Sequence, residues 1–168
     1  MKFLKPLLLC LALVAFLAIP VFAVAAEKGK ADLPAANGKD LWNYLQQVKY
    51  RKSFALWPGK GKLYKGREPH GALLTTYVNE YALSAIQGKK GTMPAESILV
   101  KENYKPDKTL AAITVMYKVA GFHPAGGNWF WVKYAPDGKV LAEGKPKGCI
   151  SCHGQKKDND WLYTGELK

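Results

Sequence analysis

Near its end the sequence carries the motif that most constrains it, Cys149-Ile150-Ser151-Cys152-His153. Two thiols separated by two residues can add to the two vinyl groups of one porphyrin. The next residue, His153, is then placed to bind the iron through an imidazole nitrogen. This is the spacing of c-type haem attachment. The motif therefore predicts one covalently bound haem c, held by Cys149, Cys152 and His153.

A Cys-x-x-Cys pair has three other interpretations. A redox dithiol is typical of an alternation of strands and helices, which this sequence lacks. A zinc site needs more ligands of this kind, and no second cysteine pair exists to complete one. A plain structural disulfide is the third interpretation, and the histidine that follows directly favours haem over it.

The N-terminus predicts export. Lys2 and Lys5 precede an almost wholly apolar stretch, residues 6–24, and Ala23-Val24-Ala25 provides small residues where a signal peptidase cleaves. We therefore expect residues 1–25 to be a cleavable signal peptide and the mature protein to lie in the periplasm. An uncleaved membrane anchor is the alternative, because the apolar stretch is nearly long enough to span a bilayer.

Cleavage changes the cysteine count and the charge. It leaves two of the three cysteines, both in the haem motif, so we expect no structural disulfide in the mature chain. The formal charge falls from +12 to +10 when Lys2 and Lys5 leave. A basic surface can steer an acidic redox partner, although scattered lysines also serve simply for solubility. Because these lysines follow no helical stripe, we expect no nucleic-acid partner.

The mature chain is expected to form one domain. Residues 26–39 are small, polar and charged and predict a flexible lead-in, and residues 40–168 predict the haem-binding domain. Asp40 is the expected cap of a helix over residues 40–50, and Asn79 the expected cap of a helix that ends at Gln87. Alternating or apolar runs predict strands at residues 72–78, 97–104, 110–119, 128–134 and 139–142.

The expected fold class is therefore α+β: mainly an antiparallel sheet, with a few short helices packed around one haem. This pattern excludes two common kinds of cytochrome. Small electron-transfer cytochromes c usually carry the motif near the N-terminus with a methionine downstream, whereas only 15 residues follow His153 and none is Met or His. Four-helix cytochromes c′ carry the motif near the C-terminus, but their chains are helical throughout.

A C-terminal haem motif behind an antiparallel sheet resembles the cytochrome P-460 and cytochrome c′-beta family. The resemblance covers roughly residues 41–163 and rests on segments at 76–79, 97–104, 127–131, 136–138 and 148–153. It implies an antiparallel sheet against the haem, a homodimer, and iron bound only by the proximal histidine, here His153. The polarity and access of the open distal side then decide what the haem does.

The resemblance implies two alternative behaviours. Cytochrome P-460 members oxidise hydroxylamine and carry an extra lysine-to-porphyrin cross-link, whereas cytochrome c′-beta members lack the cross-link and bind nitric oxide in an apolar pocket capped by phenylalanine. Lys101 matches the lysine of the family's Val-Lys-Glu segment and is the candidate cross-linking, catalytic residue. A lysine that leaves a strand is otherwise usually a solvated side chain.

We expect nitric oxide or a related small nitrogen compound as the ligand. A hydroxylamine oxidase needs a distal base, and no Asp or Glu occurs between Asp107 and Asp137, where the pocket strands are expected. Glu96 and Glu102 remain possible bases, although strand alternation beside Lys101 does not favour them. The candidate caps of an apolar pocket are Phe54, Phe122 and Phe130, and ordinary core packing is an equal alternative for each of them.

A six-coordinate electron carrier is the remaining alternative, and it needs a sixth iron ligand. His70 and His123 are candidates, but both lie in Pro/Gly turns, where a histidine is usually exposed. Met93 lies in a loop and is the better candidate of the two methionines in the expected domain. Met116 lies in the middle of a strand and is expected to serve packing.

Overall fold

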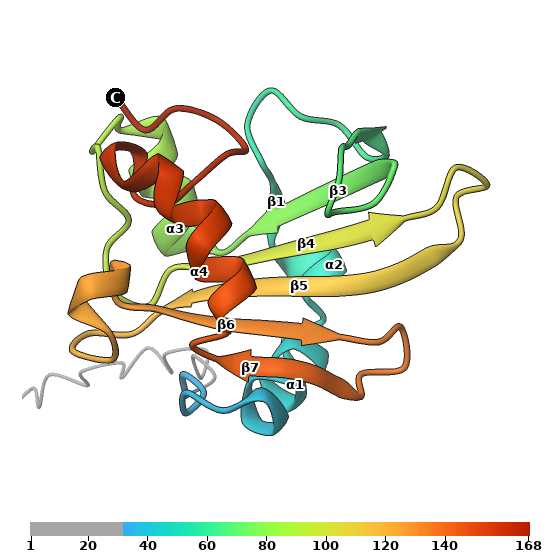
Figure 1. Ribbon diagram of the computed structural model, residues 1–168, viewed down its shortest axis with the longest axis horizontal. Helices are drawn as coiled ribbons and strands as arrows, with labels where there is room; N and C mark the ends of the chain where they lie inside the picture. The colour runs from blue at the N-terminus through green and yellow to red at the C-terminus, as the bar shows by residue number, and fades with distance from the viewer. Residues whose placement is uncertain (1–31) are drawn as a thin grey trace, which may run out of the picture. The chain divides into compact units, whose positions relative to one another are not determined.

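The computed structural model describes residues 32–168, so the predicted signal peptide, and the predicted lead-in in part, lie outside the described residues. One seven-stranded sheet forms the centre of the described chain, in the order β1-β3-β4-β5-β6-β7 with β2 also paired to β3 (Figure 1). The strands are β1 (Ala55–Leu56), β2 (Tyr64–Lys65), β3 (Leu73–Val78), β4 (Ile98–Tyr104), β5 (Leu110–Lys118), β6 (Trp129–Tyr134) and β7 (Val140–Gly144). Every strand pair is antiparallel.

Short helices surround this sheet. They are the α-helices α1 (Gly38–Gln47), α2 (Tyr50–Ser53), α3 (Glu80–Gln87) and α4 (Lys147–His153), and the 3-10 helices η1 (Pro124–Gly126) and η2 (Gly154–Asn159). The predicted α+β class is therefore confirmed. The five predicted strands are all present, and their ends lie within two residues of the predicted ends.

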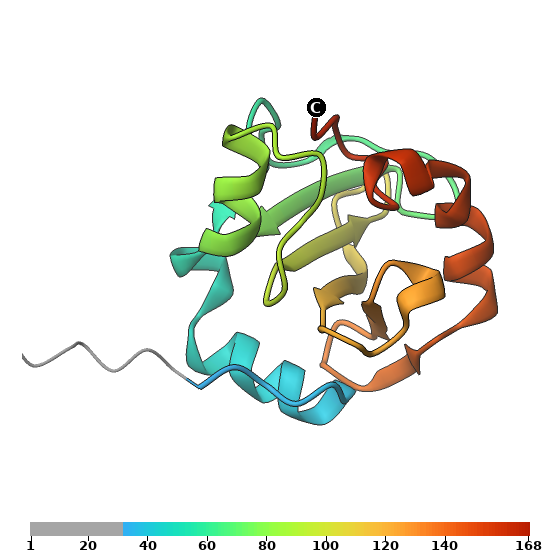
Figure 2. The same cartoon turned by 90° about the vertical axis from the view of Figure 1, so that its left-hand side faces the viewer.

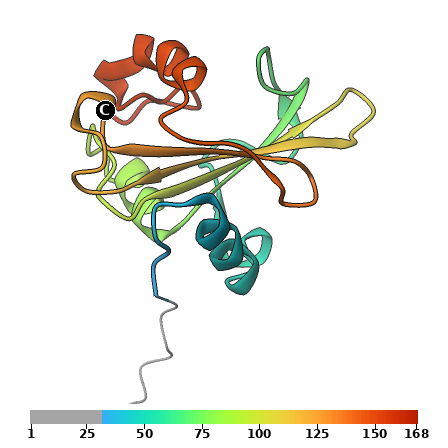
Figure 3. The same cartoon turned by 60° about the horizontal axis from the view of Figure 1, so that its bottom comes forward.

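The middle strands carry one set of side chains on each face of the sheet. Figure 3 shows α4 and the C-terminal segment on one side of the sheet, with α1 and α2 on the other. On the α1 side the buried core contains Leu41, Leu45, Ile98, Val100, Ile113, Phe130 and Val132. The α4 side buries Leu99, Trp129, Trp131, Trp161 and Leu162. The alternation predicted for β4 and β6 thus separates two cores.

The first helix begins earlier than its sequence pattern predicts. Asn37, not Asp40, is the N-cap: its side-chain oxygen accepts a hydrogen bond from the Asp40 amide at 2.8 Å. Asp40 lies in the first turn of α1, where a carboxylate interacts favourably with the helix dipole. The expectation of a cap at Asp40 is therefore wrong by three residues, although the helix itself is present.

Asn79 caps α3 as predicted and also ties the helix to the sheet. Its Oδ1 accepts from the amides of Ala82 at 3.2 Å and Ile98 at 3.0 Å, and its Nδ2 donates to the Glu96 carbonyl at 2.8 Å. The buried side chains of α3 are the small residues Ala82 and Ala85, whereas the predicted inward residues Leu83 and Ile86 are only half-buried. Small side chains let the helix approach the sheet closely.

The end of the chain returns to the segment that follows α3. Figure 2 shows the C-terminal end of the chain close to this segment. The Gly91 amide donates to the Leu167 carbonyl at 2.8 Å, and Leu167 is fully buried. This contact holds the residues after α4 against the body of the domain. Across residues 32–168, none of the helices has both the length and the apolar character needed to cross a membrane.

Candidate functional site

The cysteine motif lies on α4, which follows β7 after a short turn (Figure 1). Cys149 and Cys152 are three residues apart and therefore lie on the same side of the helix. Both thiols are free and half-buried, and His153, the last residue of the helix, is buried. All three residues line the same cavity. The helical turn thus brings the two thiols and the imidazole to one place.

His153 is oriented by a hydrogen bond to the backbone. Its Nδ1 lies 2.7 Å from the carbonyl oxygen of Trp161. Because a carbonyl can only accept, Nδ1 carries the hydrogen and Nε2 keeps its lone pair. Burial lowers the pKa of His153, and the charge of Lys101 lowers it further, against the opposing effect of the Trp161 bond. The ring is therefore neutral, the form that binds metals.

Aromatic rings surround His153. The ring centre of Trp131, on β6, lies 4.7 Å from that of His153, and the ring centre of Tyr163 lies 5.4 Å away. The Tyr163 hydroxyl donates to the Cys152 carbonyl at 3.0 Å, which fixes the end of α4. These contacts restrict the rotation of the imidazole.

The cavity in front of the motif has a volume of about 760 Å³. This is within the range of about 300–1,000 Å³ that is usual for ligand and cofactor sites. Its walls come from α4 and the residues after it, from β4, β5 and β6, and from the loop before β3. The apolar part of the lining includes Leu99, Met116, Trp131 and Leu162.

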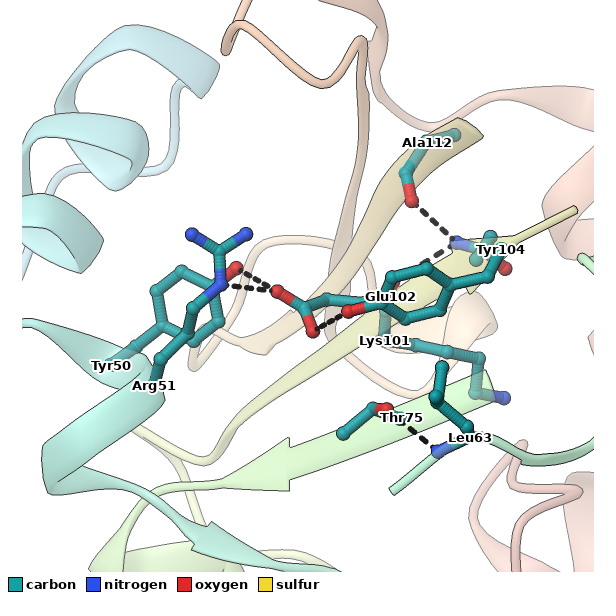
Figure 4. A network of polar contacts seen from close by, with 9 residues as sticks. Tyr50, Arg51, Leu63, Thr75, Lys101, Glu102, Tyr104 and Ala112 are labelled. Atoms are coloured by element: carbon teal, nitrogen blue, oxygen red, sulfur yellow. Dashed lines mark hydrogen bonds and ion pairs between the residues drawn. The ribbon is translucent and has the colours of Figure 1, made fainter. Parts of the chain in front are cut away.

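Lys101 lies on this cavity. Figure 4 shows its side chain leaving β4 in the direction opposite to the side chain of Glu102. Among the described residues its amine has no hydrogen bond or ion pair, and burial lowers the pKa of Lys101 to about 8. A lysine in such an environment is more often neutral and nucleophilic than one in water.

Glu102 serves the opposite face of the sheet. Its carboxylate accepts hydrogen bonds from Tyr50 at 2.8 Å, Arg51 at 2.5 Å and Tyr104 at 2.6 Å (Figure 4). Burial and the charge of Glu102 raise the pKa of Tyr50, so the phenol remains a donor. Glu102 is only 1% exposed. It is therefore a structural anion rather than a base for the cavity.

Among residues 32–168, no buried carboxylate takes its place in the cavity. Of the described residues that line the cavity, Glu68 is the only acidic one, and its side chain is exposed. Glu96 does not line the cavity and lies in the turn before β4. The cavity wall that the structure describes therefore offers no buried carboxylate as a base.

His70 lies at the cavity, although its turn predicts an exposed side chain. The residue is half-buried, and its Nδ1 lies 2.9 Å from Oδ1 of Asn103 on β4. Its ring centre is 6.2 Å from that of His153. The other turn histidine, His123, does not line the cavity. The sequence pattern does not single out Asn103, because its only signal is a polar amide within a strand.

The three candidate phenylalanines are core residues, not caps of the cavity. Phe130 points to the α1 side of the sheet, because residues of β6 alternate and Trp131 faces the cavity. Phe122 packs against Phe130 with ring centres 5.3 Å apart, and Phe54 packs on the same core. None of the three lines the cavity.

The ranking of the two methionines is also reversed. Met93 is 3% exposed in the core on the α4 side and does not line the cavity, whereas Met116 does. The loop that contains Met93 is held inward by its amide, which donates to Asp160 at 2.8 Å. Met116 faces the cavity because it alternates with Val115 along β5.

The donor set fits a haem c. Two unpaired thiols and one neutral imidazole meet at a large cavity with apolar walls, as covalent porphyrin attachment requires. A mononuclear metal site fits less well, since no group of three or more His, Cys, Asp or Glu able to hold an ion occurs in residues 32–168. When bound, a haem would supply an iron centre with Cys149, Cys152 and His153 as its holders.

A comparison with protein-family models gives an independent finding. Residues 49–164 match the model of the family described as Cytochrome P460. The matched range begins after α1 and contains the whole sheet, α4 and the loop that orients His153. A comparison with curated proteins found no match.

Proposed function

The chain belongs to the cytochrome P460 family of haem-binding cytochromes, and we propose that it carries one covalent haem c and binds nitric oxide or a related small nitrogen compound. Cys149 and Cys152 attach the porphyrin in this proposal, and His153 is the proximal ligand. A haem supplies an iron that can bind small diatomic or nitrogenous ligands when its distal side is accessible.

The observation that carries the proposal is the position of α4 over the cavity. Its two half-buried thiols and its neutral imidazole all line one space of about 760 Å³. The Trp161 carbonyl holds Nδ1 of His153, so Nε2 is the nitrogen left for iron. This arrangement supports attachment and ligation by the same short helix.

The character of the cavity favours ligand binding over oxidation. Removing electrons from hydroxylamine releases protons, and a side chain on the distal side has to accept them. Glu102 is committed to three donors on the other face of the sheet, and Glu68 is exposed. Apolar residues such as Leu99 and Met116 occupy much of the wall instead.

Hydroxylamine oxidation is a second candidate because of Lys101. The amine lines the cavity, has no partner among residues 32–168, and has a pKa lowered to about 8 by burial. These are properties of a lysine that can bond to a porphyrin. Mass analysis of the denatured holo-protein separates the two candidates, because a cross-link at Lys101 lowers the mass by the hydrogen that is lost. The Lys101→Arg variant should lack this mass loss. A mass loss that remains in Lys101→Arg would show that another residue forms the cross-link.

The main test combines mass analysis with ligand titration. The holo-protein should have the mass of the mature chain plus one haem, and nitric oxide should change the absorption spectrum of the ferrous form with a stoichiometry of one. Cys149→Ala and Cys152→Ala should lose one thioether each. A protein that binds no haem, or whose ferrous spectrum does not respond to nitric oxide, would contradict the proposal.

The cellular setting is part of the same proposal. The N-terminal pattern supports export to the periplasm through a cleaved signal, where haem is attached after translocation. The basic composition supports an acidic redox partner, and the family resemblance supports a homodimer. Mass determination by light scattering tests the dimer, and the N-terminal residue of the exported protein tests cleavage near residue 25.

A further inference from the structure

We propose that His70 is the second axial ligand of the haem iron in the resting protein. A small molecule would then bind the iron only after His70 has left it. This differs from the permanently open iron position that the sequence leads us to expect. The inference rests on the proposed function, because it assumes a haem attached at α4. It is carried by three independent features of the cavity: a distance, a tautomer and a loop contact.

The distance fits two histidines that share one metal ion. The ring centres of His70 and His153 are 6.2 Å apart, and the ring planes are inclined by 87°. An imidazole nitrogen lies about 2 Å from its metal in protein sites, so two such ligands on opposite sides of one ion have ring centres about 6 Å apart. Both rings line the same cavity as Cys149 and Cys152.

Asn103 fixes which nitrogen of His70 is available. Its Nδ2 donates to the carbonyl oxygens of Lys101 at 3.0 Å and Ala112 at 3.2 Å, and lies 3.2 Å from the Thr114 hydroxyl. Because carbonyls only accept, the amide orientation is determined and Oδ1 faces His70. Nδ1 of His70 must therefore donate to Oδ1, 2.9 Å away. Nε2 keeps its lone pair.

His70 and His153 thus have the same hydrogen-bond arrangement. Each donates from Nδ1 to a protein oxygen, the Trp161 carbonyl for His153 and the Asn103 amide for His70. Metal-binding histidines almost always have such a partner on the second nitrogen, which sets the tautomer and the ring direction. Of the other possible ligands on this wall, neither Lys101 nor the half-buried Met116 has a partner among the described residues that orients it as Asn103 orients His70.

The backbone holds the His70 loop close to β4. Gly71 lies so near Tyr104 that a Cβ atom there would be 2.5 Å from the Tyr104 nitrogen and oxygen. The pairing of β4 with β5 shifts between Asn103 and Tyr104, and such bulges often redirect a side chain at a site. Gly71 and the bulge together bring His70 to Asn103. Two backbone hydrogen bonds close the loop on itself, from the His70 amide to the Arg67 carbonyl at 3.1 Å and from the Gly66 amide to the Ala72 carbonyl at 2.8 Å. The pairing of β3 with β4 begins at Leu73, so His70 can leave without breaking a strand pair.

The test compares holo-proteins with the wild-type sequence, His70→Ala and His123→Ala. His123 is the matched control, because it is also a turn histidine but does not line the cavity. We expect six-coordinate low-spin spectra for the wild type and His123→Ala, with a highly anisotropic low-spin ferric EPR signal from the perpendicular rings. His70→Ala should be high-spin, and added imidazole should restore the low-spin spectrum.

Ligand kinetics give a second readout. For the ferrous wild type, the observed rate constant of carbon monoxide binding should level off at high ligand concentration, at the rate at which His70 leaves the iron. For His70→Ala, the observed rate constant should increase linearly with carbon monoxide concentration. At high ligand concentration it should be at least tenfold larger than that of the wild type. Asn103→Leu, which removes the orienting bond without touching iron, should lie between them.

The outcomes separate this inference from the proposed function. A wild-type holo-protein with the mass of one haem but a high-spin spectrum would overturn the ligation by His70 and leave the proposed function intact. A low-spin His70→Ala variant would do the same, because another residue would then be the ligand. Loss of the haem mass itself in the wild type would instead overturn the proposed function. A high-spin His70→Ala variant that imidazole rescues would support the inference.

Discussion

The imidazole of His153 donates its Nδ1 hydrogen to the carbonyl oxygen of Trp161, 2.7 Å away. That carbonyl follows Asp160, whose carboxylate accepts from the Met93 amide at 2.8 Å and from Lys118 at 2.6 Å. Asp160 and Trp161 both have left-handed backbone conformations, with φ values of 50° and 70°. The orientation of His153 therefore depends on an ion pair that does not touch the cavity.

Asp160→Asn should weaken this support. Lys118 is 12% exposed and would lose its charged partner, so we expect the free energy of unfolding to fall by about 3 kcal/mol. A looser Trp161 carbonyl should also make His153 a weaker donor to iron and raise the midpoint potential. Urea denaturation and redox titration of the holo-protein measure the two effects. Asp158→Asn, an exposed change of the same charge, should stay within about 0.5 kcal/mol; equal effects would contradict the prediction.

Gly127→Ala should disturb the same loop from the other side. A Cβ atom at Gly127 would lie 2.6 Å from Nε1 of Trp161, in a backbone with φ of 68°. Gly121 has a similar φ of 74° but nothing within 4 Å. We therefore expect Gly121→Ala to cost about 1–2 kcal/mol from backbone strain alone, and Gly127→Ala to cost about 1–3 kcal/mol more from overpacking. Thermal unfolding compares them, and matching losses would show that Trp161 adapts.

Glu102→Gln should destabilise the fold without changing the haem. The amide removes the charge that Arg51 and the two tyrosines share, and we expect a loss of about 2–4 kcal/mol. The absorption and EPR spectra should be unchanged, because Glu102 and the cavity lie on opposite faces of β4. Glu166→Gln, at an exposed position, is the control. A changed spectrum in Glu102→Gln would place this carboxylate in the distal site after all.

The pKa of Lys101 predicts a rise of stability in alkali. Burial lowers this pKa from 10.5 to about 8 in the folded protein, so between these values the unfolded chain holds more protons. The free energy of unfolding then increases as the pH rises from 8 to 10.5, by at most about 3 kcal/mol. Below pH 8, Lys101 is charged in both the folded and the unfolded protein, and burial of this charge lowers the free energy of unfolding by its full amount. The prediction applies to protein whose mass shows no cross-link at Lys101.

Lys101→Met provides the comparison. The variant should be more stable than the wild type at pH 7, and the difference should shrink toward pH 10.5 because only the wild type loses a buried charge. Denaturation curves at the two pH values give the difference in the free energy of unfolding between the two proteins. The contributions of other titrating groups are the same in both proteins and cancel in this difference. A difference that does not depend on pH would show that Lys101 titrates as it does in water.

Much of the fold could be predicted because local patterns and tertiary contacts agree. Alternation along β4 separates Val100 from Lys101, and the amide of Asn79 both caps α3 and binds β4. Alternation defines two faces of a sheet but does not say which one receives a cofactor. The phenylalanine caps failed for this reason, since Phe130 lies on the face of Glu102 rather than on that of Trp131.

The contact that orients His70 could not be predicted, because it joins residues that are far apart in the sequence. His70 and Asn103 are separated by 33 residues and meet only after β3 and β4 pair. The helix α4 was not predicted either, since its seven residues are too few to show a helical period. The motif on it was nevertheless recognisable, because the chemistry of attachment fixes the spacing directly.

Lys101 and Glu102 are consecutive residues, so a single peptide bond separates the reactive face of the protein from the network that stabilises it. Only the register of β4 decides which face each side chain occupies. With the start of β4 held in place, loss of one codon between Ile98 and Val100 would exchange them, taking the acid into the cavity and the amine into the core. Loss of one codon in the exposed turn at residues 105–109 would leave both in place. Single-residue deletions in this gene should therefore be tolerated much less before Lys101 in β4 than in the turn that follows the strand.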